Sequence, residues 1–303
     1  MILAMKLLSF KYDGKTLFGP KVKKEEAVWD VQKIAEAVGE EGFPASIAEG
    51  VASGMDFIEQ IRNLCEQARE HEEMDSLKYS FDAIEWLSPI PRTPKNVLCV
   101  GKNYADHASE MGGEGTPEKL MIFTKSPTAI AADEQTVSVH SSLTSQYDYE
   151  GELAVVIGKG GRNIPKQLAY DTIFGYTIAN DLTARDLQAE RKQFFLGKTL
   201  DGSCPLGPYI VTKDEIPNPH NLSIVTKVND DVRQNGNTGS MSVPIDEIIE
   251  ELSKYVTLEP GDVILTGTPA GVGKGMTPPA YLKAGDTVKV SVEGIGTLVN
   301  YFK

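Results

Sequence analysis

The N-terminal part of the chain combines short apolar runs with segments of helical periodicity. Residues 5–12 and 16–19 predict two strands, with Gly14 turning the chain between them. Apolar residues recur three and four positions apart over residues 30–38 and 55–69, which predicts two amphipathic helices. The pattern predicts a small α+β unit at the start of the chain.

The rest of the chain consists mainly of short apolar or alternating runs separated by turn residues, which is typical of strands. The predicted strands are residues 97–100, 120–124, 136–139, 151–157, 173–180, 209–211, 223–228, 263–266, 287–292 and 297–300. One amphipathic helix is predicted over residues 244–255, with Ser242 as its candidate N-cap.

A polar connection and a proline-rich passage separate the two regions. The acidic run at residues 70–76 predicts a solvated connection, and the prolines between Pro89 and Pro94 then interrupt regular structure. We therefore expect a small α+β N-terminal domain at residues 1–90 and a main domain at residues 91–303. The predicted fold class is mixed α/β and β-rich.

Composition and charge narrow the function classes. The chain has 303 residues, of which 41% are hydrophobic, and a formal net charge of −13 at pH 7. That charge disfavours binding to nucleic acid or to an anionic membrane. No run approaches the roughly 20 apolar residues of a membrane span, and no N-terminal run is typical of a signal peptide. Cys65, Cys99 and Cys204 are widely spaced without a CxxC pair, so we expect a cytoplasmic protein with reduced thiols.

Acids occupy alternate positions at the start of the predicted strand at residues 151–157. Asp148, Glu150 and Glu152 are spaced two apart, and side chains with this spacing on a strand share a face. Carboxylates held this close repel one another unless a positive charge lies between them. A hard divalent cation with oxygen ligands fits best.

Asp181 is the best candidate for a further ligand, because it follows the apolar strand at residues 173–180. Alone it would be interpreted as a turn or helix cap; together with Glu150 and Glu152 it favours a metal site. Oxygen-only ligation indicates Mg²⁺, Mn²⁺ or Ca²⁺, since zinc would require histidine or cysteine nearby. Asp148 could be a fourth ligand, but we interpret it as a surface acid.

His107 and Glu110 are three residues apart, which on a helical turn places them side by side. A carboxylate beside an imidazole makes a dyad that can activate water or remove a proton. The alternative is an exposed histidine with an incidental glutamate. The Gly-rich residues 111–117 that follow predict a lid able to order over substrate.

Cationic and amide side chains stand near these acids. Lys125, Arg185, Gln188 and Lys198 would each be interpreted singly as surface residues, but jointly they could bind a carboxylate or keto oxygens.

The loop at residues 266–275 resembles a phosphate-binding loop only superficially. Thr268 stands where the first glycine of that motif is required, and Gly275 stands where Ser or Thr should coordinate magnesium. We therefore reject nucleotide binding. A turn whose backbone amides approach a substrate carboxylate is still open.

In combination, these motifs closely resemble the fumarylacetoacetate hydrolase family over about residues 95–300. The matching segments, in family order, are Lys102-Asn-Tyr-x-x-His107-x-x-Glu110, Phe123-x-Lys125, Tyr149-Glu-x-Glu152-Leu-Ala, Gly175-Tyr-Thr-x-x-Asn-Asp181-x-Thr-Ala-Arg-Asp186, Gly197-Lys198 and Gly267-Thr-Pro269. Residues 1–90 resemble the variable N-terminal extension of longer bacterial members.

The resemblance implies the family's mixed β-sandwich roll, usually a homodimer, with Mg²⁺ or Mn²⁺ as cofactor. It implies metal ligands Glu150, Glu152 and Asp181; a catalytic dyad His107 and Glu110 with Lys198 as the supporting cation; and Arg185 and Gln188 around the substrate. Lys125, Gly267 and Thr268 are further candidate substrate-binding residues. Fumarylacetoacetases themselves add an acidic ligand before the histidine. Lys102 and Asn103 occupy that neighbourhood here, which favours the acylpyruvase and oxaloacetate decarboxylase branch.

We expect a small-molecule substrate, a short 2-oxo acid that is cleaved or decarboxylated through a metal-stabilised enolate. Oxaloacetate decarboxylation or acylpyruvate hydrolysis is favoured. A 2-hydroxymuconate-type isomerase or an oxaloacetate keto–enol tautomerase is the alternative among enzymes. A metal-stabilised regulatory or scaffold protein is the alternative outside them.

Overall fold

The computed structural model describes residues 5–70, 74–112 and 117–303. The predicted connection at residues 70–76 and the predicted lid at residues 111–117 therefore lie partly outside the described residues. The helices are α1 (Val31–Val38), α2 (Ile47–Gly50), α3 (Met55–Glu70), α4 (Ala105–Glu110), α5 (Arg185–Glu190), α6 (Phe195–Lys198) and α7 (Ile245–Tyr255).

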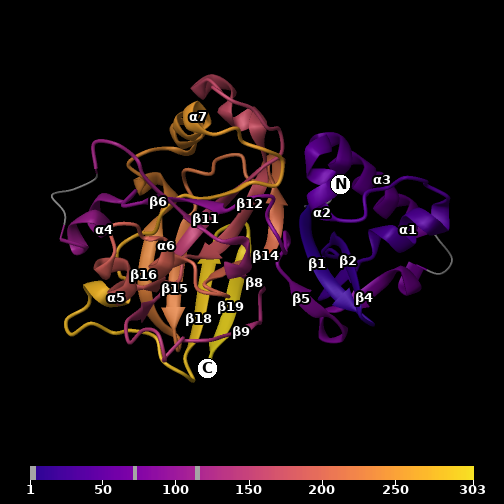
Figure 1. The fold of residues 1–303 in the computed structure, drawn as a ribbon. Helices are drawn as coiled ribbons and strands as arrows, with labels where there is room; N and C mark the ends of the chain where they lie inside the picture. Colours follow the sequence, from indigo (N-terminus) through magenta and orange to yellow (C-terminus); the bar gives the residue numbers. More distant parts are fainter. Residues whose placement is uncertain (1–4, 71–73, 113–116) are drawn as a thin grey trace.

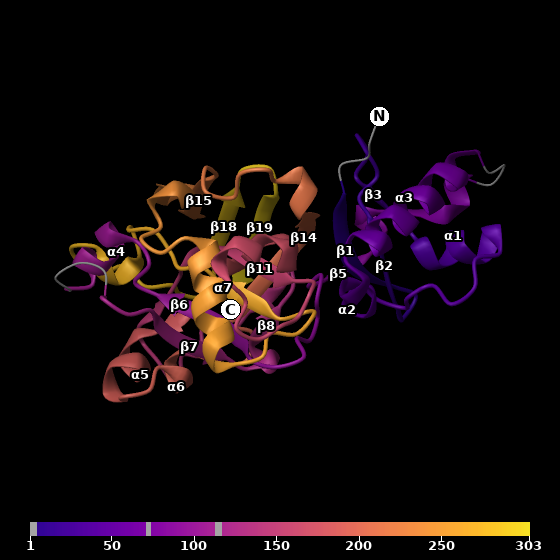
Figure 2. The same ribbon diagram turned by 90° about the horizontal axis from the view of Figure 1, so that it is seen from above.

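The strands are β1 (Lys6–Tyr12), β2 (Lys15–Pro20), β3 (Ala27–Trp29), β4 (Lys78–Ser80), β5 (Glu85–Leu87), β6 (Val97–Gly101), β7 (Met121–Lys125), β8 (Ile130–Ala131), β9 (Thr136–Val137), β10 (Tyr147–Asp148), β11 (Gly151–Ile157), β12 (Ile173–Asn180), β13 (Thr183–Ala184), β14 (Cys204–Thr212), β15 (Ser223–Val228), β16 (Asp231–Asn237), β17 (Val263–Leu265), β18 (Thr287–Val292) and β19 (Gly296–Phe302). The fold is mixed α/β and β-rich, with a smaller N-terminal domain beside the main one (Figures 1 and 2).

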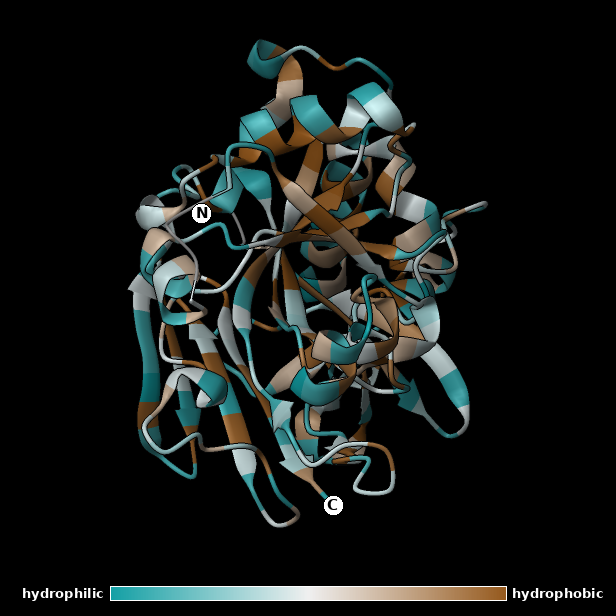
Figure 3. Ribbon diagram, turned by 60° about the vertical axis from the view of Figure 1, so that its left-hand side comes forward, coloured by the Kyte–Doolittle hydropathy of each residue, from teal (hydrophilic) through white to brown (hydrophobic). Residues whose placement is uncertain are grey.

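Two sheets make the main domain a sandwich. One has the strand order β2-β1-β14-β12-β11-β17-β6-β7, and the other β16-β15-β18-β19-β9. Strand β11 is buried on both faces: Leu153 and Val155 belong to the core between the sheets, whereas Ala154 and Val156 belong to the core on the opposite face. This explains why residues 153–157 are continuously apolar. Hydrophobic residues accordingly concentrate on the inner strands (Figure 3).

The N-terminal domain joins the large sheet instead of standing apart. Strand β1 pairs antiparallel with β14, with Leu7 opposite Ile210. Phe57 of α3 contributes to the same core as Phe174 of β12, and their ring centroids are 6.5 Å apart. The N-terminal helices therefore cover the face of the sheet that lies opposite the second sheet.

The structure differs from the local predictions at Ser242 and at β16, among other places. Ser242 does not cap α7, since the N-cap position is Pro244 and the Ser242 N–H instead donates to the Asn103 carbonyl oxygen. Strand β16 was not predicted, because its exposed edge carries mostly polar residues and so shows no apolar pattern.

Candidate active site

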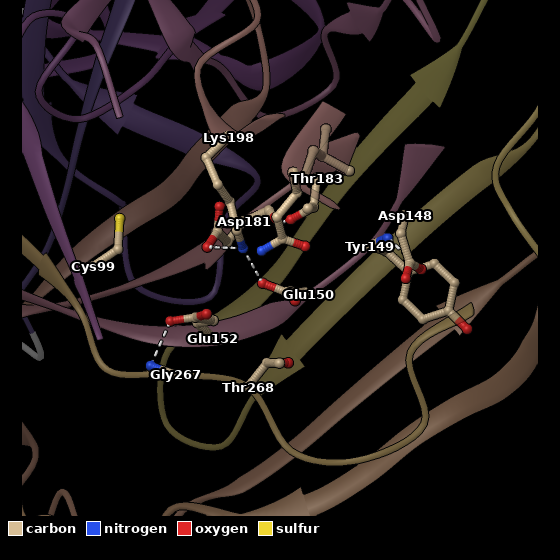
Figure 4. Close-up of polar contacts among 12 residues, drawn as sticks. Cys99, Asp148, Tyr149, Glu150, Glu152, Asp181, Thr183, Lys198, Gly267 and Thr268 are labelled. Carbon is tan, nitrogen blue, oxygen red and sulfur yellow. Dashed lines mark hydrogen bonds and ion pairs between the residues drawn. The ribbon is translucent and has the colours of Figure 1, made fainter. Parts of the chain in front are cut away.

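Three carboxylates meet where the central strand β11 begins and its neighbour β12 ends. The antiparallel register pairs Gly151 with Asn180, which places Glu150 opposite Asp181, and the Asp181 N–H donates to the Glu150 carbonyl oxygen. Carboxylate oxygens of Glu150, Glu152 and Asp181 lie within 4.8 Å of one another, and all three residues are buried (Figure 4). The structure therefore brings the predicted ligands together.

Two of these carboxylates are already surrounded by cations. Lys198 Nζ lies 2.5 Å from Glu150 Oε2 and 2.7 Å from Asp181 Oδ2. Arg185 Nη1 lies 2.8 Å from Glu150 Oε1, and Lys125 Nζ lies 2.7 Å from Asp181 Oδ1. Burial would raise the pKa of Glu150, but Lys198 and Arg185 outweigh it and lower that pKa. Glu150 is thus held ionised.

Glu152 has no comparable partner. Its Oε2 accepts a 2.6 Å hydrogen bond from the Gly267 N–H, and no ammonium or guanidinium lies within 4.0 Å of it among the described residues. Burial, followed by the charges of Asp181 and Glu150, raises the pKa of Glu152 well above its ordinary value. An all-oxygen cluster with one uncompensated carboxylate fits a hard divalent ion such as Mg²⁺ or Mn²⁺.

Asp148 is not a surface acid, and that interpretation was wrong. Its side chain is 0% exposed. Oδ2 accepts from Arg185 Nε at 2.8 Å and from the Lys274 N–H at 3.0 Å, while Oδ1 accepts from the Gly273 N–H at 2.7 Å. Asp148 therefore orients Arg185 toward Glu150 and holds the loop at residues 266–275. The sequence did not reveal these contacts, because they join segments that are far apart along the chain.

His107 and Glu110 form the predicted pair on α4. His107 Nδ1 lies 3.2 Å from Glu110 Oε2, and the Gly271 N–H donates to Glu110 Oε1 at 3.0 Å. His107 is only 5% exposed, which excludes the alternative of an exposed histidine. His107 thus directs Nδ1 at Glu110, while Nε2 faces Glu150 Oε1 at 4.0 Å.

A cavity of about 200 Å³ lies over this cluster. Its lining comprises Val100, Gly101, Lys102, His107, Met111, Met121, Phe123, Glu150, Glu152, Arg185, Gln188, Ala189, Phe194, Lys198, Thr268 and Lys274. Among the predicted substrate-binding residues, Arg185, Gln188 and Thr268 line this cavity. Lys102 and Lys274 also line it, and the sequence interpretation assigned neither a role, although Lys102 directly follows β6 in the segment that carries His107.

The other two predicted substrate-binding residues, Lys125 and Gly267, do not line this cavity. Lys125 is fully buried, and besides Asp181 its Nζ donates to the Leu182 carbonyl oxygen at 3.0 Å. Lys125 therefore supports a carboxylate of the cluster. Gly267 likewise uses its N–H on Glu152, and its φ of +98° is one that L side chains rarely adopt.

Comparison with known proteins identifies the chain. Residues 96–303 match the family described as Fumarylacetoacetate (FAA) hydrolase C-terminal. The chain belongs to the fumarylacetoacetate hydrolase family. An uncharacterized protein of Staphylococcus aureus strain USA300 is 52% identical over 300 residues, covering 98% of this chain and 99% of that protein. The predicted family and fold are confirmed.

Solved structures of family members superpose closely on the chain. Fumarylacetoacetate hydrolase from Exiguobacterium antarcticum has a TM-score of 0.81 and 42% identity, covering 99% of both chains. The 2-hydroxyhepta-2,4-diene-1,7-dioate isomerase from Mycobacterium marinum has a TM-score of 0.73 and 29% identity, covering 98% of both. Fumarylpyruvate hydrolase from Pseudomonas aeruginosa, solved with Mn²⁺ and pyruvate, has a TM-score of 0.63 and 31% identity, covering 69% of this chain and 89% of that one.

None of the helices in residues 5–70, 74–112 and 117–303 combines the length and apolar character needed to cross a membrane.

Proposed function

We propose that this protein is a divalent-metal-dependent enzyme that acts on short 2-oxo acids, as an oxaloacetate decarboxylase, an acylpyruvate hydrolase or both. The observation that carries the proposal is the placement of the buried cluster Glu150, Glu152 and Asp181 beside the His107–Glu110 pair at one small cavity. The relative solved with Mn²⁺ and pyruvate supports the same metal and product class.

Glu150, Glu152 and Asp181 would hold the cation, which supplies Lewis-acid polarisation of the 2-oxo acid. Arg185 and Lys198 place positive charge beside the same carboxylates, where they stabilise negative charge that develops on the substrate.

Hydrolysis and decarboxylation depend on His107 to different degrees. In hydrolysis, Nε2 accepts a proton from water as that water attacks the distant carbonyl, and Glu110 stabilises the resulting imidazolium from the Nδ1 side. The C3–C4 bond then breaks, which releases the carboxylic acid and pyruvate as its enolate, and the enolate carbon takes back a proton from the imidazolium. In decarboxylation the carboxylate at C4 leaves as CO₂ and no water attacks, so the base is not needed for bond cleavage. One site can therefore support both reactions with different dependence on His107.

A double-bond isomerase is the second candidate, because a relative that matches nearly the whole chain bears that activity in its name. His107 could then carry a proton between two carbons of the substrate. Turnover of a 2-hydroxymuconate analogue would favour this candidate.

The decisive experiment assays oxaloacetate, acetylpyruvate and a 2-hydroxymuconate analogue, each with Mg²⁺ and with Mn²⁺. We expect turnover of oxaloacetate or acetylpyruvate that is lost on chelation and restored by added metal. Glu150→Gln should weaken Mn²⁺ binding and turnover together; unchanged Mn²⁺ affinity would remove Glu150 from the site. Tight metal binding without turnover of any of these acids would overturn the enzyme proposal in favour of a metal-stabilised scaffold.

A further inference from the structure

A second cavity, of about 570 Å³, lies between the N-terminal domain and the main domain. It shares no lining residue with the active-site cavity. Four acids line it: Glu26 and Asp82 come from the N-terminal domain, and Asp133 and Glu134 come from the main domain. Among the described residues no lysine, arginine or histidine lines it, so the cavity carries negative charge contributed by both domains.

Asp133 distinguishes this cavity from an ordinary acidic surface, because it is only 6% exposed. Its Oδ1 accepts from the Val299 N–H at 2.7 Å, which is a neutral donor. No ammonium or guanidinium nitrogen of the described residues lies within 4.0 Å of its carboxylate. A buried carboxylate without a cation is costly, and burial accordingly raises the pKa of Asp133 to about 7. The cavity therefore contains a buried acid whose charge no neighbouring side chain balances.

The other acids leave most of the negative charge free as well. Glu26 pairs with Lys21 at 2.8 Å. Asp82 and Glu134 are exposed, and in the described part of the chain neither has a cationic nitrogen within 4.0 Å. Three of the four acids are thus available to a cation that enters the cavity.

Three aromatic side chains, Phe81, Trp86 and Tyr209, also line the cavity. The Trp86 ring centroid lies 4.8 Å from that of Phe81 and 6.0 Å from that of Tyr209, both in edge-to-face geometry. Lys21 Nζ lies over the Phe81 ring at 4.5 Å, and Lys6 Nζ lies over the Tyr209 ring at 5.7 Å. No described lysine or arginine lies over Trp86, although the indole ring attracts cations most strongly.

We propose that this cavity binds a small organic polycation of the polyamine class. Its ammonium groups pair with the Asp133 carboxylate and lie over the Trp86 ring, and its methylene chain packs against Phe81 and Tyr209. The aromatic lining favours an organic cation over a hydrated metal ion, because methylene groups gain from apolar contact and water ligands do not. The volume of the cavity falls within the roughly 300–1,000 Å³ that is usual for small-molecule sites. Because the acids come from both domains, the bound polycation also holds the two domains together.

The test titrates spermidine into the full-length protein by calorimetry at pH 8, where Asp133 is ionised, and at about 0.15 M salt, which screens nonspecific attraction. We expect binding at one site. Asp133→Asn should weaken it about tenfold, because the amide keeps the Val299 hydrogen bond but loses the charge. Trp86→Leu should weaken it about threefold, because leucine keeps apolar contact but removes the aromatic face.

Two further measurements keep the result independent of folding defects in these variants. Asp82→Asn changes an exposed acid of the cavity and should weaken spermidine binding about threefold. Spermidine should also raise the Tm of the wild-type protein and have less effect on Asp133→Asn. The matched controls Asp171→Asn and Tyr255→Leu change an exposed acid and an exposed tyrosine outside the cavity lining, and they should bind spermidine like the wild type.

Four outcomes would overturn the proposal. They are no spermidine binding by the wild-type protein, unchanged binding in Asp133→Asn, a loss in Asp171→Asn equal to that in Asp133→Asn, and displacement of spermidine by an equal concentration of Mg²⁺. The last outcome would assign the cavity to an inorganic cation. None of these measurements involves 2-oxo acid turnover, so the result stands whether or not the proposed function is correct.

Discussion

Lys198 Nζ lies 2.5 Å from Glu150 Oε2, within the carboxylate cluster that fits a divalent ion. The same ammonium group reaches Asp181 Oδ2 at 2.7 Å. Burial would lower the pKa of Lys198, but the charges of Asp181 and Glu150 outweigh it and raise that pKa. The lysine is therefore held as a cation, and it would share Glu150 and Asp181 with a metal bound at this cluster.

Lys198→Met should therefore bind Mn²⁺ more tightly, by about tenfold, while losing most turnover. Removing the ammonium leaves Glu150 and Asp181 less compensated, which increases their attraction for the ion and destabilises the metal-free protein by about 3–5 kcal/mol. Calorimetry gives the affinity, and thermal unfolding should show a larger stabilisation by Mn²⁺ than in wild type. The control Lys159→Met removes an exposed lysine outside the cavity lining. Weaker Mn²⁺ binding in Lys198→Met, with wild-type Mn²⁺ binding in Lys159→Met, would contradict this account.

Asp148→Asn should lower kcat/KM by at least tenfold although Asp148 does not line the cavity. The asparagine side chain has a single acceptor oxygen, because its other terminal group is a donor. It therefore loses hydrogen bonds either from Arg185 Nε or from the loop N–H groups of Gly273 and Lys274. Steady-state kinetics measures the effect, and the exposed Asp171→Asn is the control. Wild-type kinetics in Asp148→Asn would show that Arg185 is oriented without it.

Gly275→Ala should impair hydrolysis more than decarboxylation. A Cβ at Gly275 would stand 2.2 Å from the Glu110 carboxyl group, so the added methyl group displaces Glu110 from His107.

His107→Ala should likewise abolish acetylpyruvate hydrolysis and spare part of the oxaloacetate decarboxylation. Mn²⁺ affinity should stay at the wild-type value in both variants, which checks that the carboxylate cluster is intact. Equal loss of both activities would contradict the division of roles.

The sequence predicted those site residues whose pattern is contained within a few neighbouring positions, and it missed contacts between distant segments. Glu150 and Glu152 were predictable because strand alternation and the apolar run at 153–157 are encoded within a few residues. The environment of Asp148 was not, because its partners come from α5 and from the loop at residues 266–275.

The same reason separates the predicted from the missed elements of the fold. The buried strands β11 and β12 have the predicted bounds, since burial on both faces requires a mostly apolar run, which the local sequence shows. Strand β14 is longer than the predicted residues 209–211, because Cys204 and the residues after it pair with neighbouring strands despite two prolines and a glycine. Pairing partners far along the chain thus decide strand length where the local pattern is weak.

Asp133 gives the stability of the protein a pH dependence that is independent of the metal-binding cluster. The side chain is 6% exposed, and burial raises its pKa to about 7, although Oδ1 accepts from the Val299 N–H at 2.7 Å. Below pH 4 the carboxyl group is protonated in both folded and unfolded chains. Between about pH 4 and 7 the Asp133 carboxyl group ionises only in the unfolded chain, so the stability of the folded protein falls as the pH rises through this window.

Asp133→Asn should remove that part of the pH dependence, because an amide does not ionise and can still accept from Val299. We expect the variant to gain stability relative to wild type as the pH is raised from 5 to 8, by roughly 1–3 kcal/mol. Urea unfolding at both pH values, with the exposed Asp171→Asn as control, measures the difference. A constant difference between variant and wild type at the two pH values would show that Asp133 has an ordinary pKa in the folded protein.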